Sequence, residues 1–217
     1  PPSFILINSR NLAKGIFPTP PPNPPPAFRN HSLPLRGRPL STLSKPPAAV
    51  SRPLFLKMIH INIIFVGTIK ERYLNDAVRE YEKRLSGYAS VNNISVREER
   101  LPDNPSAAEI NAAVAREGER ILAAIPPRSY AVALCVEGKQ YSSPEFARLL
   151  SERMAYGSSE FSFIIGGSVG LSVAVKRRCD LRLSISEMTF PHQLMRVILL
   201  EQLYRAYNIL SGGKYHK

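Results

Sequence analysis

Short apolar runs alternate along this chain with segments whose apolar residues recur every three or four positions. The apolar runs are typical of strands buried on both faces. They predict strands at 59–66, 94–97, 130–136, 161–165 and 181–186, of which 94–97 is the weakest. Helical spacing predicts helices at 70–86, 106–125, 143–156, 173–178 and 191–210. Because strands alternate with helices, we expect an α/β fold with a mostly parallel sheet and helices on both faces.

Residues with strong local preferences mark several boundaries of these elements. Ser106 and Glu109 form a capping box, in which the two side chains satisfy free backbone amides at the start of a helix. The prolines at 126–127 end that helix. Residues 137–139, Glu-Gly-Lys, predict a turn that ends the following strand.

Composition divides the chain in two. Residues 1–57 hold 14 of the 20 prolines and eight Lys or Arg residues, but no Asp or Glu. The other 160 residues carry 21 basic and 17 acidic groups, hence only +4 of the net charge of +12. The high charge is therefore a poor argument for nucleic-acid binding by the folded part. We expect a disordered, Pro-rich basic leader at 1–57 and one folded domain at 58–217.

Three interpretations of the leader stay open. Met58 is the first methionine and the globular pattern starts directly after it, which favours translated sequence upstream of a miscalled start. An acid-free extension with Arg and Ser is also typical of an organelle transit peptide. A Pro-rich ligand for a partner domain is the third interpretation. We expect a cytoplasmic protein, or a plastid or mitochondrial one if the leader is a transit peptide.

Several classes of function are disfavoured. The apolar runs stop at roughly eight residues, so we expect no membrane span. Cys135 and Cys179 lie 44 residues apart without a CxxC motif, which predicts reduced cysteines in the core. The four histidines are scattered and no carboxylates cluster around them, so we expect no metal site.

A glycine-rich loop follows the strand at 161–165. Its sequence, GGSVGLS from Gly166 to Ser172, is neither a GxGxxG dinucleotide fingerprint nor a P-loop, and a simple tight turn explains it equally well. Parallel sheets bind ligands beyond the carboxyl ends of their strands, and glycine lets a ligand approach the backbone. The candidate strand ends are 134–136, 166–167 and 185–188. We expect a ligand crevice there.

The last helix and the tail after it are rich in polar and aromatic side chains. Such groups can stack on a base, exchange a proton or meet a phosphate, and the candidates are His192, Arg196, Tyr204, Arg205, Tyr215 and His216. Structural alternatives exist for each. His192 can cap the helix, Arg196 and Glu201 can form a solvated ion pair, and the tail can simply fray. The basic run at 176–178 is either a solvated face or a phosphate contact.

Together, these segments resemble one family. FIIGGSVGLS at 163–172, SISEMTFPHQLMRVILLEQLYRAYNI at 184–209 and the closing KYHK are similar to the RlmH family. Its members are SPOUT-class methyltransferases that methylate N3 of a pseudouridine in large-subunit ribosomal RNA. VGTIKERYLNDAVREYEKRL near the start of the domain and AREGERIL also match, so the resemblance covers residues 58–217. The leader has no counterpart.

The resemblance implies a doubly covered parallel sheet whose C-terminal part is a trefoil knot, a rare exception among chain topologies. It also implies a homodimer with S-adenosylmethionine (S-adenosyl-L-methionine) held in the knot. The implied cofactor-binding residues are Leu134, Gly166, Ile185, Ser186, Glu187, Met188, Thr189 and Phe190. Leu134 and Ile185 would supply apolar walls, backbone groups would bind the cofactor, and a bare Gly166 would let it lie against the chain.

The implied reaction transfers a methyl group to a base nitrogen that must lose its proton. The implied catalytic residues are His192, Arg196, Tyr204, Arg205, Tyr215 and His216. An arginine can stabilise negative charge on the base and His216 can accept the proton, although the sequence does not decide the general base. We expect the tail and last helix to form the RNA face, against the partner subunit's cofactor. Because the domain has modest net charge, we expect it to recognise the assembled ribosome rather than free RNA.

Three rival functions stay open beside this one. The first is a SPOUT-type enzyme with a different base or ribose target. The second is a non-enzymatic RNA-binding protein of the same fold. The third is a Rossmann-type nucleotide enzyme, which the absence of GxGxxG disfavours.

Overall fold

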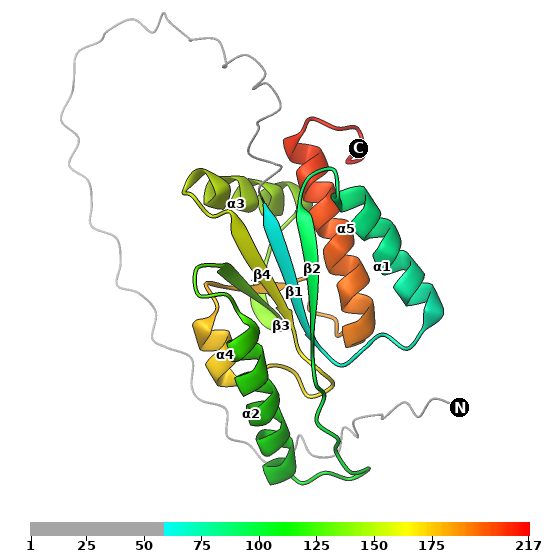
Figure 1. Cartoon of the computed structure of the whole chain (residues 1–217), viewed down its shortest axis with the longest axis vertical. Coiled ribbons are helices and arrows are strands. Elements are labelled where there is room, and N and C mark those ends of the chain that lie inside the picture. Colours follow the sequence, from blue (N-terminus) through cyan, green and yellow to red (C-terminus); the bar gives the residue numbers. More distant parts are fainter. Residues whose placement is uncertain (1–58) are drawn as a thin grey trace, which may run out of the picture. The chain divides into compact units, whose positions relative to one another are not determined.

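The computed structural model describes residues 59–217, so the expectations for the leader at 1–57 lie outside the described residues (Figure 1). The strands are β1 (His60–Val66), β2 (Ser90–Val96), β3 (Tyr130–Gln140), β4 (Glu160–Ile165) and β5 (Leu181–Ser184). The helices are α1 (Arg72–Leu85), α2 (Ala107–Ala124), α3 (Ser143–Ala155), α4 (Val173–Arg178) and α5 (His192–Leu210). All the predicted strands and helices are present in the predicted order, and the capping box of α2 is confirmed.

The strands form one sheet in the order β2-β1-β4-β3-β5, and each neighbouring pair is parallel. The predicted parallel sheet is therefore confirmed. The prediction for β2 started four residues late, because this edge strand carries polar side chains. Asn92 donates to Asn62 Oδ1 (3.2 Å), and Asn62 in turn donates to Glu160 Oε1 (2.9 Å). Side-chain amides thus bridge the edge of the sheet where apolar residues would have given a clearer signal.

Each face of the sheet is covered by its own helices (Figure 1). Successive side chains of β1 alternate between the faces: Ile63 and Phe65 pack with α1, α3 and α5, whereas Ile64 packs with α2 and α4. β4 follows the same rule, because Phe163 lies on the first side and Ile164 on the second. The expectation of helices on both faces is confirmed.

The turn predicted at 137–139 is wrong, because β3 continues to Gln140. Its pairing with β5 shifts register between Leu134 and Lys139, and both of these residues lie opposite Leu183. A Cβ atom at Gly138 would lie 2.6 Å from the carbonyl carbon of Leu183. Glycine therefore allows an irregular stretch of β3 to stay against β5, where the sequence suggested that the strand stops.

Two neighbouring residues of α2 fix the glycine-rich loop that follows β4. Gly118 lets α2 lie against Ser172, the N-cap of α4, since a Cβ atom there would overlap the Ser172 side chain. Glu117 is only 3% exposed, and its Oε1 accepts a hydrogen bond from the Glu99 amide (2.9 Å). Its other oxygen has no partner and would lie 3.4 Å from a Cβ atom at Gly167. Helix α2 thus joins the end of β2 to the glycine loop through a buried carboxyl group.

Burial raises the pKa of the Glu117 carboxyl, and the charges of Glu98 and Glu99 act in the same direction, while the hydrogen bond from the Glu99 amide opposes them. The folded state therefore favours the protonated group. At pH values between the ordinary carboxyl pKa and the raised one, Glu117 is protonated in the folded state but ionised in the unfolded state. The contribution of Glu117 to stability therefore falls as pH rises.

We expect Glu117→Gln to remove this loss. The free energy of unfolding of this variant, minus that of the native protein, should increase with pH. The increase should be on the order of 1 kcal/mol from pH 4 to neutrality. Urea unfolding at a series of pH values measures the difference. Glu119→Gln, an exposed change on the same helix, controls for net charge. Parallel pH profiles of Glu117→Gln and the native protein would contradict this account.

Candidate functional site

Three of the predicted cofactor-binding positions lie at neighbouring strand ends. Leu134 on β3 is paired with Ile165 on β4, so it lies beside Gly166, the next residue along the chain. Leu134 is also paired with Leu183 on β5, two residues before Ile185. Because these strands are parallel and adjacent, their carboxyl ends bring Leu134, Gly166 and Ile185 to one place on the sheet edge.

The glycine loop after β4 is tight. Gly170 has φ = 82°, a conformation that favours glycine, and its amide donates to the Gly167 carbonyl (3.1 Å). A Cβ atom at Gly166 would lie 2.7 Å from the carbonyl carbon of Gly170. The closure of the loop itself therefore requires glycine at position 166. The sequence suggested a different reason, namely the close approach of a ligand to Gly166.

The segment 185–190 connects β5 to α5 and lies largely at the surface. Its internal hydrogen bonds run from Ser184 Oγ to the Ser186 carbonyl (2.9 Å) and from the Met188 amide to Ser186 Oγ (3.0 Å). Ile185 packs partly on the core, whereas Met188 is 71% exposed, and Glu187 and Thr189 are exposed as well. Phe190 is half-buried. Polar backbone groups beside the apolar Leu134 and Ile185 fit a ligand with both polar and apolar parts.

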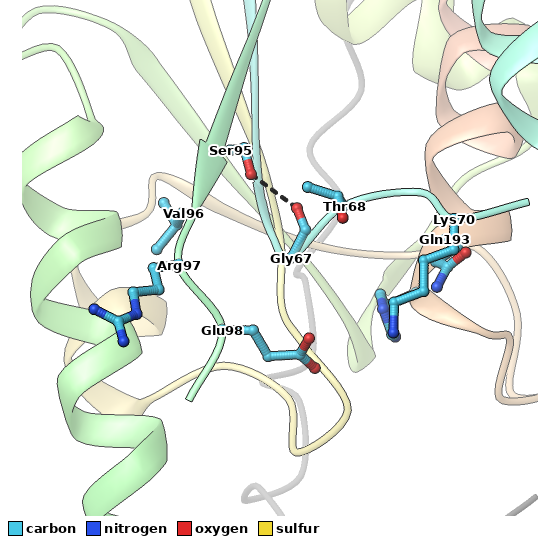
Figure 2. Close-up of a pocket in the computed structure, with 9 residues that line it drawn as sticks. Gly67, Thr68, Lys70, Ser95, Val96, Arg97, Glu98 and Gln193 are labelled. Carbon is cyan, nitrogen blue, oxygen red and sulfur yellow. Dashed lines mark hydrogen bonds between the residues drawn. The ribbon is translucent and has the colours of Figure 1, made fainter. Parts of the chain in front are cut away.

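A cavity of about 400 Å³ lies farther along the same edge of the sheet, at the carboxyl ends of β1 and β2 (Figure 2). It is lined by Gly67, Thr68, Lys70, Ser95, Val96, Arg97, Glu98, His192 and Gln193. Of the predicted site residues, only His192 takes part. The others were missed because most of them are polar and they come from three separate segments. Gly67 directly follows a buried strand and could have indicated the cavity, since the carboxyl end of every strand in a parallel sheet is a candidate ligand site.

Arg196 lies inside the fold. It is 8% exposed, its guanidinium stands 3.6 Å from the centre of the Phe65 ring, and its Nη2 donates to Asn93 Oδ1 (3.2 Å). Burial lowers the pKa of Arg196. The prediction from the sequence that Arg196 forms a solvated ion pair with Glu201 is wrong. Arg196 instead fastens α5 to β1 and β2.

The remaining candidates gather at the C-terminal end of α5. Arg205 pairs with Glu201, with Arg205 Nε to Glu201 Oε1 at 2.9 Å, and its guanidinium lies 4.6 Å from the centre of the Tyr215 ring. Tyr204 packs edge-on against Tyr215 with ring centres 4.9 Å apart. Arg205 Nη1 lies 3.4 Å from His216 Nδ1. Glu201, which the sequence interpretation paired with Arg196, holds this cluster together, and its spacing of four from Arg205 is the usual one for a helical ion pair.

The tail is held back against α5 and does not fray. The amides of Gly213 and Tyr215 donate to the carbonyl and to Oδ1 of Asn208 (2.8 and 3.0 Å). The last two residues are exposed. These contacts hold the Tyr215 cluster at one end of α5, while His192 and the segment 185–190 lie at the other (Figure 1). The six catalytic candidates therefore do not form one group within a single chain.

The other predicted features have simple outcomes. Both cysteines are free and half-buried, and burial raises the pKa of Cys179 to about 11. Within the basic run, Lys176 pairs with Glu137 and Arg178 donates to the Pro127 carbonyl (3.3 Å). Across residues 59–217, no three His, Cys, Asp or Glu side chains are grouped as metal ligands would be. No helix in this part of the chain has the length and apolar character needed to span a membrane.

Comparison with known proteins agrees with the resemblance seen in the sequence. Residues 59–216 match the family described as "Predicted SPOUT methyltransferase". The ribosomal RNA large subunit methyltransferase H of Carboxydothermus hydrogenoformans is 54% identical over 159 residues, which cover 73% of this chain and 100% of that protein. The protein of the same name from an Exiguobacterium species is 50% identical over the same shares.

Solved structures are more distant. A probable methyltransferase from Bordetella pertussis Tohama I has a TM-score of 0.44 and 16% identity, over 69% of this chain and 95% of that one. The sequence comparisons extend over essentially all the described residues, and the chain therefore belongs to the RlmH family of SPOUT methyltransferases.

Proposed function

We propose that this protein methylates N3 of a pseudouridine in large-subunit ribosomal RNA, with S-adenosylmethionine as the methyl donor. The observation that carries the proposal is sequence identity of 50–54% along the full length of two large-subunit rRNA methyltransferases. Identity at this level, without large gaps in coverage, supports a shared reaction as well as a shared fold.

The residues at the ends of β3, β4 and β5 fit such a cofactor. Ile185 is partly exposed and lies beside the buried Leu134, so the two can supply an apolar wall for an adenine ring. The backbone groups of 185–190 outside the two hydrogen bonds of Ser186 can serve the polar groups. S-adenosylmethionine, when bound, supplies an electrophilic methyl group. What remains for the protein is to align the acceptor nitrogen and to stabilise it as it loses its proton.

Arg205 suits the second of these tasks. Its hydrogen bond with Glu201 raises the pKa of Arg205, so this side chain stays cationic and cannot serve as the base. A fixed guanidinium can stabilise negative charge on the carbonyl oxygens that flank N3. His216 lies beside it and can accept the proton directly or through a water molecule.

A homodimer would bring these groups to the cofactor. Helix α5 has 19 residues, a length of about 28 Å, and it separates the tail cluster from the segment 185–190. The first half of the helix carries half-buried apolar residues, namely Leu194, Val197 and Ile198. A second copy that covers these residues with its own α5 running antiparallel would place the partner's tail near the cofactor.

Three further expectations remain proposals. The C-terminal part of the domain forms a trefoil knot. The domain comprises residues 58–217, with residues 1–57 as a separate leader. The protein acts in the cytoplasm on the assembled ribosome, or in a plastid or mitochondrion if the leader is a transit peptide.

The reaction can be tested with radiolabelled S-adenosylmethionine and ribosomes that lack the modification. We expect label in large-subunit rRNA of assembled ribosomes, much less in isolated large subunits, and one methylated pseudouridine after nuclease digestion and mass spectrometry. Ile185→Glu should abolish cofactor binding in calorimetry by placing a charge on the apolar wall. Tyr156→Glu, at an 84% exposed position, is the matched control. Methyl groups on a ribose or on another base would contradict the proposed target.

The dimeric arrangement predicts complementation between two defective chains. Arg205→Ala should lower kcat by roughly 10²- to 10³-fold, as for loss of an oxyanion-stabilising donor. A heterodimer of Ile185→Glu with Arg205→Ala has one intact site if the tail acts on the partner's cofactor, and about half of the native activity should return. If each tail serves its own chain, both sites stay defective. Differently tagged, co-purified heterodimers decide between these outcomes.

A further inference from the structure

The proposed function assigns no role to the cavity at the carboxyl ends of β1 and β2. Its floor is fixed by the backbone. The Gly67 amide donates to the Val96 carbonyl (2.9 Å), and Ser95 Oγ donates to the Gly67 carbonyl (2.8 Å; Figure 2). Gly67 has φ = 76°, and a Cβ atom there would lie 3.2 Å from Glu98 Oε2. The loop is therefore shaped by a glycine that no other residue replaces without strain.

Two cations border this floor without carboxylate partners. Figure 2 shows Arg97 on one side of Gly67 and Lys70 beside Gln193 on the other. Among the ion pairs of residues 59–217, none includes Lys70 or Arg97. Lys70 precedes Glu71, the N-cap of α1, and the first turn of the helix contains no acidic residue. The helix dipole does not favour a cation near this end, so it does not account for Lys70.

The cavity also contains groups that a simple anion site would avoid. The Glu98 carboxyl lies between the two cations in Figure 2, where it would repel a free phosphate. Thr68 and Gln193 add a hydroxyl and an amide. This lining suits a ligand that carries both negative charge and N–H or O–H donors. A nucleotide has both, and a volume of about 400 Å³ lies within the range of small-molecule pockets.

The location connects this cavity to the proposed cofactor site. β1 is paired with β4, with Phe65 opposite Ile165, so the loops after these two strands are neighbours. A Cβ atom at Gly167 would lie 3.1 Å from Val66 Cγ1, which places the glycine loop directly against the end of β1. His192, in the cavity wall, lies two residues after the segment 185–190. A ligand in the cavity therefore lies beside the expected methyl donor.

We infer that this cavity binds a nucleotide of the single-stranded part of the RNA substrate, with Lys70 and Arg97 meeting its backbone phosphates. Glu98 and Gln193 face the donors and acceptors of the base or ribose. The inference rests on the proposed function, because it names where the RNA acceptor enters.

The test compares two double variants that remove the same charge. Lys70→Ala/Arg97→Ala empties the cavity of its cations, and Arg72→Ala/Arg79→Ala removes two exposed arginines of α1 near Asp76. Binding of the fluorescently labelled protein to assembled ribosomes that lack the modification is measured by fluorescence anisotropy at a series of salt concentrations. The first variant should bind about tenfold more weakly than the native protein. Its plot of log affinity against log salt concentration should be less steep by about 1.4. Affinity for S-adenosylmethionine, measured by calorimetry, should stay within about twofold of native.

Several outcomes overturn the inference. Equal losses in the two double variants would show that the cavity adds nothing beyond general charge. Displacement of the ribosome by inorganic phosphate, beyond the effect of chloride at equal ionic strength, would reduce the cavity to an anion site. Failure of the proposed function is separate, since it appears as absent methyl transfer in the native protein while ribosome binding still depends on Lys70 and Arg97.

Discussion

Parallel pairing of all five strands is the constraint on which the arrangement of this domain depends. Parallel neighbours cannot be joined by short hairpins, so each connection crosses a face of the sheet, and all the carboxyl ends collect on one edge. The two sites discussed above are consequences of this geometry. The proposed cofactor residues occupy the ends of β4, β3 and β5, and the cavity occupies the ends of β2 and β1. The order of strands therefore places the two proposed sites side by side.

The same constraint explains which parts of the fold could be predicted. Strands covered on both faces require continuous apolar runs, and β1, β3 and β4 were predicted well for this reason. β2 lies at an edge and uses Asn92 to bridge to β1, so its sequence carries little of that signal. The extension of β3 past Gly138 was not predictable either. It depends on space between two backbones, which no local pattern records.

The candidate site was predictable where one local motif supplies it, and unpredictable where tertiary contacts do. The residues at the ends of β3, β4 and β5 follow from strand ends and a glycine loop, and the structure places them together. Arg196 looked like a surface group because its neighbours in sequence are mixed, but its partners Phe65 and Asn93 come from other strands. The tail was expected to be either frayed or functional. The structure orders it through Asn208, a residue with no distinctive signal in the sequence.

That order at Asn208 limits what the tail can reach. Tyr215 lies five residues beyond the last residue of α5, and five fully extended residues span at most about 18 Å, less than the length of roughly 28 Å for the helix itself. The hydrogen bonds of Gly213 and Tyr215 to Asn208 hold this part of the tail at the end of α5. Reaching the cofactor segment of the same chain would require breaking these bonds and the packing of Tyr215 on Tyr204. A second copy whose α5 runs antiparallel to the first needs no such rearrangement, because each tail then stays bound to its own helix. The ordering of the tail thus favours catalysis across a dimer over catalysis within one chain.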